Sequence, residues 1–171
     1  MIRHVLTLIG PDRTGIISTL ADGVRAMDGN WLASRMARLA GQFAGVVEFD
    51  LPKASETKLG MLLARLRDDG LAVTVQRGQS AATTAGSRWR IDLLGNDRQG
   101  IVREISRAVA SIGGNIEELE SRVNSSPMTG TPLFELQGTV RLPEAVDPAV
   151  LQRALEAIGT DFSVDIRLTA D

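Results

Sequence analysis

The sequence predicts an α+β protein built from two ferredoxin-like domains in tandem, each with the element order βαββαβ. Two observations carry this prediction. The sequence matches itself at an offset of 85 residues, which indicates two homologous units. Within each unit, strand-like runs and segments of helical periodicity follow one another in the same order. We therefore expect two antiparallel sheets, each with its helices on one face.

The repeat is strongest over residues 8–31, which align without a gap with residues 93–116. Nine of these 24 aligned positions are identical. They include a Gly-x-Asp-Arg-x-Gly-Ile motif, at residues 10–16 and 95–101, and a later Gly-Asn pair. We predict one domain over residues 1–78, a second over residues 88–171, and a small, polar linker over residues 79–87.

In each half, a strand, a helix, two strands, a second helix and a last strand are predicted in turn. For the first half these elements are residues 3–9, 16–27, 31–39, 44–51, 53–69 and 71–76. For the second half they are residues 89–94, 101–112, 116–124, 133–142, 148–158 and 162–168. Asp12 is expected to cap the first helix, and Gly29-Asn30 to end it. The loop at 125–132 is longer than its counterpart near Gly41.

Composition limits the classes of function. Hydrophobic residues make up 43% of the chain and charged residues 23%, which is typical of a globular protein, and the net charge of −2 does not favour direct binding to nucleic acid. The chain has no cysteine, no readable signal peptide and no apolar run long enough to cross a membrane. These features predict a cytoplasmic protein. The only histidine, His4, is expected at the surface or at a sheet edge.

The motif lies between a strand and a helix, and this position suggests a binding role. A helix N-terminus offers free N–H groups to an anion such as the carboxylate of an amino acid. The aspartate could hold the ammonium group of the same ligand, and the glycine lets the ligand approach the backbone. The alternative is structural: the aspartate caps the helix and the glycine allows close packing. Asn30 and Asn115 likewise either offer an amide to a ligand or end the helix in a left-handed conformation.

No pattern in the sequence points to catalysis. It contains no nucleophile elbow, no phosphate-binding loop and no set of metal ligands. We therefore expect a protein that is not an enzyme, with no catalytic residues, no bound metal and no cofactor.

The repeated motif, followed by a helix and Gly-Asn, resembles the ACT domain family. Two copies that fill the chain resemble the glycine cleavage system transcriptional repressor family. The resemblance implies an effector, glycine or another small amino acid, and a protein partner such as a transcriptional activator. It also implies two sites, formed by Asp12, Arg13, Thr14, Gly15, Ile16 and Asn30, and by Asp97, Arg98, Gln99, Gly100, Ile101 and Asn115. Pro11 and Thr14 become Asn96 and Gln99 in the second copy, so we expect unequal sites.

Two other functions are compatible with the same residues. The chain could be an interaction module that has lost effector binding, or a regulatory subunit of a metabolic enzyme. Ferredoxin-like domains also leave edge strands and one sheet face uncovered, which favours pairing. We therefore expect the two halves to pack together and the chain to form a homodimer.

Overall fold

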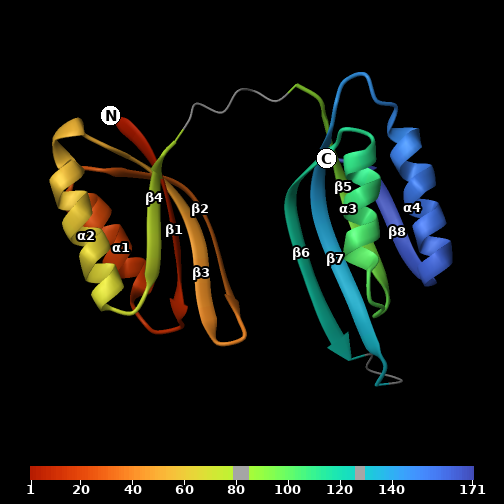
Figure 1. Ribbon diagram of the computed structural model, residues 1–171, viewed down its shortest axis with the longest axis horizontal. Helices are drawn as coiled ribbons and strands as arrows, with labels where there is room; N and C mark the ends of the chain where they lie inside the picture. Colours follow the sequence, from red (N-terminus) through yellow and green to blue (C-terminus); the bar gives the residue numbers. More distant parts are fainter. Residues whose placement is uncertain (79–84, 126–129) are drawn as a thin grey trace. The chain divides into compact units, whose positions relative to one another are not determined.

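The computed structural model describes residues 1–78, 85–125 and 130–171, and the chain divides into two compact units, Met1–Ala82 and Thr83–Asp171. Each unit has a four-stranded antiparallel sheet with two α-helices on one face (Figure 1). The predicted fold class is therefore confirmed. Most of the predicted linker, at residues 79–84, lies outside the described residues. So does part of the 125–132 loop.

The first unit follows the predicted order. Its elements are β1 (Ile2–Pro11), α1 (Ile16–Ala26), β2 (Asn30–Leu39), β3 (Gln42–Leu51), a short 3-10 helix (Lys53–Ser55), α2 (Glu56–Asp68) and β4 (Ala72–Arg77). The strands lie in the order β2-β3-β1-β4. Alternate residues of β1 and β3, such as Leu6 and Val47, face the two helices and are fully buried, as the period of two in a strand requires. Leu20 and Leu66 cover them from α1 and α2.

The second unit repeats this plan. Its elements are β5 (Ser87–Asn96), α3 (Ile101–Ser111), β6 (Asn115–Ser125), β7 (Pro132–Leu142), α4 (Pro148–Phe162) and β8 (Val164–Ala170). The strands lie in the order β6-β7-β5-β8. Strands β2 and β6 carry a register shift at matching places, between Trp31 and Ala33 and between Ile116 and Glu118. No helix in the described part of the chain is long and apolar enough to cross a membrane.

The first helix of each unit ends in a Schellman motif, and this corrects the prediction for Gly29-Asn30. In α1 the left-handed residue is Asp28, with φ of 54°, and the N–H of Gly29 donates to the carbonyl of Val24 at 3.0 Å. In α3 the equivalent residue is Gly113, with φ of 74°. Asn30 and Asn115 are the first residues of β2 and β6, so they do not end the helices themselves.

Two further predictions were wrong. His4 is buried, with 5% of its surface exposed, and its ring stacks on that of Phe49 because both residues point from neighbouring strands toward the helices. Helix α4 extends four residues past the predicted end at Ile158. It continues through Gly159 and stops at Ser163, which adopts a left-handed conformation with φ of 55°.

Candidate functional site

The Gly-x-Asp-Arg-x-Gly-Ile motif forms the same strand-to-helix loop in both units. Gly15 and Gly100 are the N-cap residues, with φ of 95° and 99°, a region that favours glycine. Their carbonyls accept the first helical hydrogen bonds, from Thr19 at 2.9 Å and from Glu104 at 3.0 Å. Ile16 and Ile101 then bury their side chains in the two cores. The loop geometry is thus fixed by glycine conformation and by one apolar anchor.

Asp12 does not cap α1, which corrects the prediction. The N-cap position belongs to Gly15, and neither α1 nor α3 has a side-chain cap. Instead, the backbone N–H of Asp12 donates to the carbonyl of Gly41 at 3.0 Å. In the second unit the N–H of Asp97 donates in the same way to Pro132 at 3.1 Å. The aspartate backbone therefore ties the loop to the hairpin beside it, and its side chain is left for other contacts.

The charged side chains of the first loop are held in ion pairs. Arg38 Nε lies 2.8 Å from the Asp12 carboxylate, and Arg13 lies 3.3 Å from the Asp69 carboxylate. Arg38 comes from the far end of β2, and Asp69 is the C-cap residue of α2. Both charges of the first motif are thus neutralised within the unit. Thr14 is exposed beside them.

The second loop lacks these partners. Arg38 lies opposite Phe43 in the first sheet, and the residue in that place opposite Phe134 is Val123. The side chain of Val123 carries no charge, so it cannot form an ion pair with Asp97. Over residues 85–125 and 130–171, Asp97 and Arg98 have no ion pair and no side-chain hydrogen bond. Their side chains, and that of Gln99, are exposed at the start of α3.

The asparagines do not converge with the loops inside one unit. Asn30 lies opposite Asp50, and Asp50 also pairs with Arg3 at the start of β1. Pro11, which precedes the loop, lies eight residues further along β1, a distance of about 27 Å at strand spacing. Asn115 has the matching position opposite Arg141. A small amino acid cannot touch the loop and the asparagine of the same unit.

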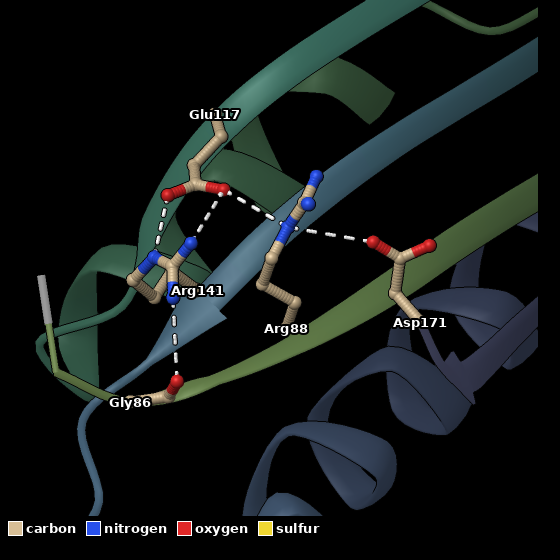
Figure 2. Close-up of polar contacts among 5 residues, drawn as sticks. All are labelled: Gly86, Arg88, Glu117, Arg141 and Asp171. Atoms are coloured by element: carbon tan, nitrogen blue, oxygen red, sulfur yellow. Dashed lines mark hydrogen bonds and ion pairs between the residues drawn. The ribbon is translucent and has the colours of Figure 1, made fainter. Parts of the chain in front are cut away.

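A charged network occupies the end of the second sheet near Asn115 (Figure 2). Glu117 accepts hydrogen bonds from Arg141 at 2.6 and 3.3 Å and lies 3.3 Å from Arg88. The hydrogen bond from Arg141 lowers the pKa of Glu117 below its ordinary value. Arg141 also donates to the carbonyl of Gly86, and Arg88 lies 3.4 Å from Asp171. These contacts join the start of β5 to β6 and β7, which is a structural role.

One pocket of about 580 Å³ lies beside the second loop, and the sequence reasoning missed it. It is lined by Asn96 at the end of β5, by Glu156 and Gly159 of α4, and by Asp165 of β8. The one available signal was Gly159, a glycine inside a helical pattern. Among the described residues, no three His, Cys, Asp or Glu side chains gather as a metal site would require.

Comparison with known proteins agrees with this architecture. The model of the ACT domain family matches residues 3–76. A crystal structure of an unknown protein from Galdieria sulphuraria has a TM-score of 0.87 and 29% sequence identity, over 99% of this chain and 98% of that one. A candidate glycine cleavage system transcriptional repressor has a TM-score of 0.67 and 18% identity, over 98% and 96% of the two chains, which shows a shared fold. No curated protein matches the sequence.

The second unit has the sheet order and the loop of the first, on a sequence that repeats it at an offset of 85 residues. Residues 3–76 are therefore similar to the ACT domain family, and the second unit repeats the same fold and the same loop.

Proposed function

We propose that the chain is a non-catalytic regulator that responds to a small amino acid, such as glycine, and passes this signal on through contact with another protein. One observation carries the proposal: an ACT domain at residues 3–76 is followed by a second copy of its fold and its Gly-x-Asp-Arg-x-Gly-Ile loop. ACT domains are regulatory modules. The second loop offers what a zwitterion requires, which is a carboxylate, a guanidinium and the N–H groups of a helix start.

The second loop is the stronger of the two candidate sites. Asp97 can accept from the ligand ammonium, and Arg98 can donate to the ligand carboxylate. In the first loop, a ligand would first have to displace Arg38 from Asp12 and Asp69 from Arg13. Glu104, in the first turn of α3, would repel a bound carboxylate. This repulsion is reduced because Oε1 of Glu104 lies 3.9 Å from Arg103 Nε and 3.7 Å from Arg107 Nη1.

Calorimetry of the full chain against the twenty common amino acids tests the proposal. We expect saturable heat for at least one small amino acid and none for the corresponding amide or decarboxylated amine, because both ligand charges are used. No heat and no thermal shift with any amino acid would contradict a sensor role.

An interaction module without an effector is the second candidate, and the uncovered face of the first sheet favours it. Ile9 and Val46 on that face are 50% and 37% exposed, and they lie on neighbouring strands. Small residues, Ala37 and Ala44, lie beside them. Such a surface suits a protein contact. In this case the loops would have only their structural role, and replacing Asp97 would leave partner binding unchanged.

A further inference from the structure

The two sheets differ on the face that their helices leave uncovered (Figure 1). On the first sheet this face is apolar around Ile9, which is half exposed. Its neighbours across the sheet are Ala44 on β3, Ala37 beyond it on β2, and Ala72 on β4. Two residues away along β3, Val46 adds further exposed apolar surface. We call these five residues the apolar patch.

The second sheet carries polar and charged residues around the same place. The repeat matches Ile9 with Leu94, and strand pairing then matches the rest of the apolar patch with the neighbours of Leu94. In the places of the three alanines and of the valine stand Glu135, Arg122, Asp165 and Gln137. The fold therefore does not require an apolar patch. Its presence on the first sheet alone indicates a contact surface.

The polar residues level with the apolar patch do not prevent it from being covered. Thr7 and Thr74 lie side by side on β1 and β4, and their hydroxyl groups hydrogen-bond to each other. A partner on this face would therefore not leave these hydroxyls without a partner of their own. Arg35 lies opposite Val46 but on the edge strand β2, where an interface has its polar rim.

The size of the face suits a dimer. Three strands of ten residues and one of six form it. At the usual strand spacings their combined area is about 600 Å². Two such faces packed together would bury about 1,200 Å², which reaches the lower end of the range for specific interfaces. A second copy of the chain supplies a face of equal size and equal apolar character.

The order of residues along β1 and β3 makes this face complementary to itself. Ile9 and Ala44 are cross-strand neighbours, and so are Arg3 and Asp50 at the other end of the same two strands. Arg3 Nε lies 3.2 Å from the Asp50 carboxylate. A twofold axis parallel to the strands, between β1 and β3, exchanges the two members of each pair. Ile9 then packs over the small Ala44 of the partner subunit, and Arg3 faces the opposite charge on Asp50 of the partner subunit.

The other twofold arrangement is less complementary. An axis perpendicular to the strands would lay Arg3 and Asp50 over Pro11 and Gln42, at the far end of β1 and β3, which carry no charge. Taking these charges out of water against uncharged residues has a desolvation cost without a new attraction. Both arrangements keep the strands of the two sheets aligned, as packed sheets do, so the charges decide between them.

We propose that the uncovered face of the first sheet binds the same face of a second copy of this chain, about a twofold axis parallel to its strands. The proposal names the partner for the protein contact of the second candidate function. It does not depend on the response to an amino acid.

Sedimentation of the full chain across micromolar concentrations tests the contact. The wild-type chain is expected to dimerise, and Val46→Lys to weaken the dimer at least tenfold, because an ammonium group would enter its apolar centre. Gln137→Lys is the matched control at the same place on the second sheet, and it should leave dimerisation unchanged. Circular dichroism checks that both variants fold. A monomeric wild-type chain would overturn the proposal and leave the face to a different protein, and equal losses in the two variants would also overturn it.

Mixing two charge-reversal variants tests the axis. Arg3→Glu brings like charges together at two symmetric contacts, and so does Asp50→Arg, so each is expected to weaken the dimer roughly tenfold. A one-to-one mixture restores opposite charges at both contacts and should contain more dimer than either variant alone at the same total concentration. The ion pair inside each subunit is lost in the mixture and in the separate samples alike, so its loss cancels.

A mixture that is no more dimeric than the separate variants would overturn the proposed arrangement. None of these outcomes decides whether an amino acid gives heat at the loops. A monomeric chain that still binds an amino acid would contradict the dimer alone, and a dimer without such heat would contradict the sensor role alone.

Discussion

At the scale of single residues, Asp12 shows how one side chain can be assigned the wrong partner from sequence. An aspartate shortly before the apolar start of a helix is a common N-cap signal. Here the cap position belongs to Gly15, and the carboxylate turns to Arg38 instead. Arg38 lies 26 residues away, on a strand end whose position depends on the fold. Local spacing alone does not contain that information.

This difference predicts that replacing Asp147 and replacing Asp12 with alanine reduce the free energy of unfolding of their units by unequal amounts. Asp147 is a true cap, since its carboxylate accepts from the N–H of Ala149 at 3.0 Å. Asp147→Ala should therefore reduce the free energy of unfolding of the second unit by about 1 kcal/mol. Asp12→Ala removes an exposed ion pair and should cost the first unit less than about 1 kcal/mol.

Denaturant unfolding measures both costs. Trp31 and Trp89 pack against the cores of the first and second units, so their fluorescence reports the units separately in Trp→Phe backgrounds. A larger loss of unfolding free energy in Asp12→Ala than in Asp147→Ala would contradict this prediction and would indicate that Asp12 does cap α1.

Glu117 predicts how stability depends on acid. Arg141 lowers the pKa of Glu117 in the folded unit, so the folded state favours the charged carboxylate more than the unfolded state does. The resulting stability is present above the unfolded pKa, near 4.3, and is lost as the pH falls through the lower folded pKa. Glu117→Gln should therefore flatten the acid limb of the stability curve of the second unit.

Unfolding of the wild-type chain and of Glu117→Gln between pH 6 and pH 3 checks this. The two curves should converge toward the acid end. Glu118→Gln serves as a comparison at a neighbouring residue of β6. Parallel curves for wild type and Glu117→Gln would mean that the network contributes no pH-dependent stability.

At the scale of elements, the order and type of the α-helices and strands that the structure describes could be read from the sequence, because hydrophobic period and turn residues agree in both copies. The short 3-10 helix at Lys53–Ser55 was not distinguished from α2. Ends were harder. Helix α4 passes through Gly159, since a single glycine weakens a helix without stopping it. The burial of His4 was missed because a lone polar residue in a strand is usually exposed, whereas here it stacks on Phe49.

The candidate site was predictable in part. The two loops are local, so their strand-to-helix geometry followed from the motif. The positions of Asn30 and Asn115, at the other end of the sheet, follow from strand register, which the sequence does not show. The ion pairs that distinguish the two loops also depend on register. A Cβ at Gly159 would lie 2.9 Å from the carbonyl oxygen of Val164, so this glycine allows α4 to approach β8 closely, and that contact depends on tertiary packing.

The end of α2 gives a prediction at this scale. The guanidinium of Arg67 offsets the partial negative charge of the carbonyl groups in the last turn of α2, and its Nη2 donates to the carbonyl of Val73. Arg67→Ala should reduce the free energy of unfolding of the first unit by about 1 kcal/mol. Arg65→Ala is the control in the same helix turn, and it is expected to cost less. Unfolding is followed by the fluorescence of Trp31. Equal losses of unfolding free energy in Arg67→Ala and Arg65→Ala would mean that only positive charge near the helix end matters, and not the hydrogen bond to Val73.

At the scale of the whole molecule, the uncovered sheet faces and edge strands predict self-association. Sedimentation at micromolar concentration is expected to show a homodimer. Ile9→Lys adds a charge to the exposed apolar face of the first sheet, and it should weaken a dimer formed through that face. Val150→Lys, at an exposed position on α4, is the matched control. A monomer at every concentration would contradict the prediction.

The proposed response to an amino acid depends most on the second loop, which is the stronger candidate site. The most direct measurement is calorimetry of amino-acid binding to the wild-type chain and to two matched variants, Asp97→Asn and Asp12→Asn. Asp97→Asn is expected to weaken binding by about tenfold, the usual loss when a charge-assisted hydrogen bond is removed. Asp12→Asn should leave the affinity nearly unchanged, because Asp12 is already paired with Arg38. No amino-acid binding to the wild-type chain, or a loss confined to Asp12→Asn, would contradict the account.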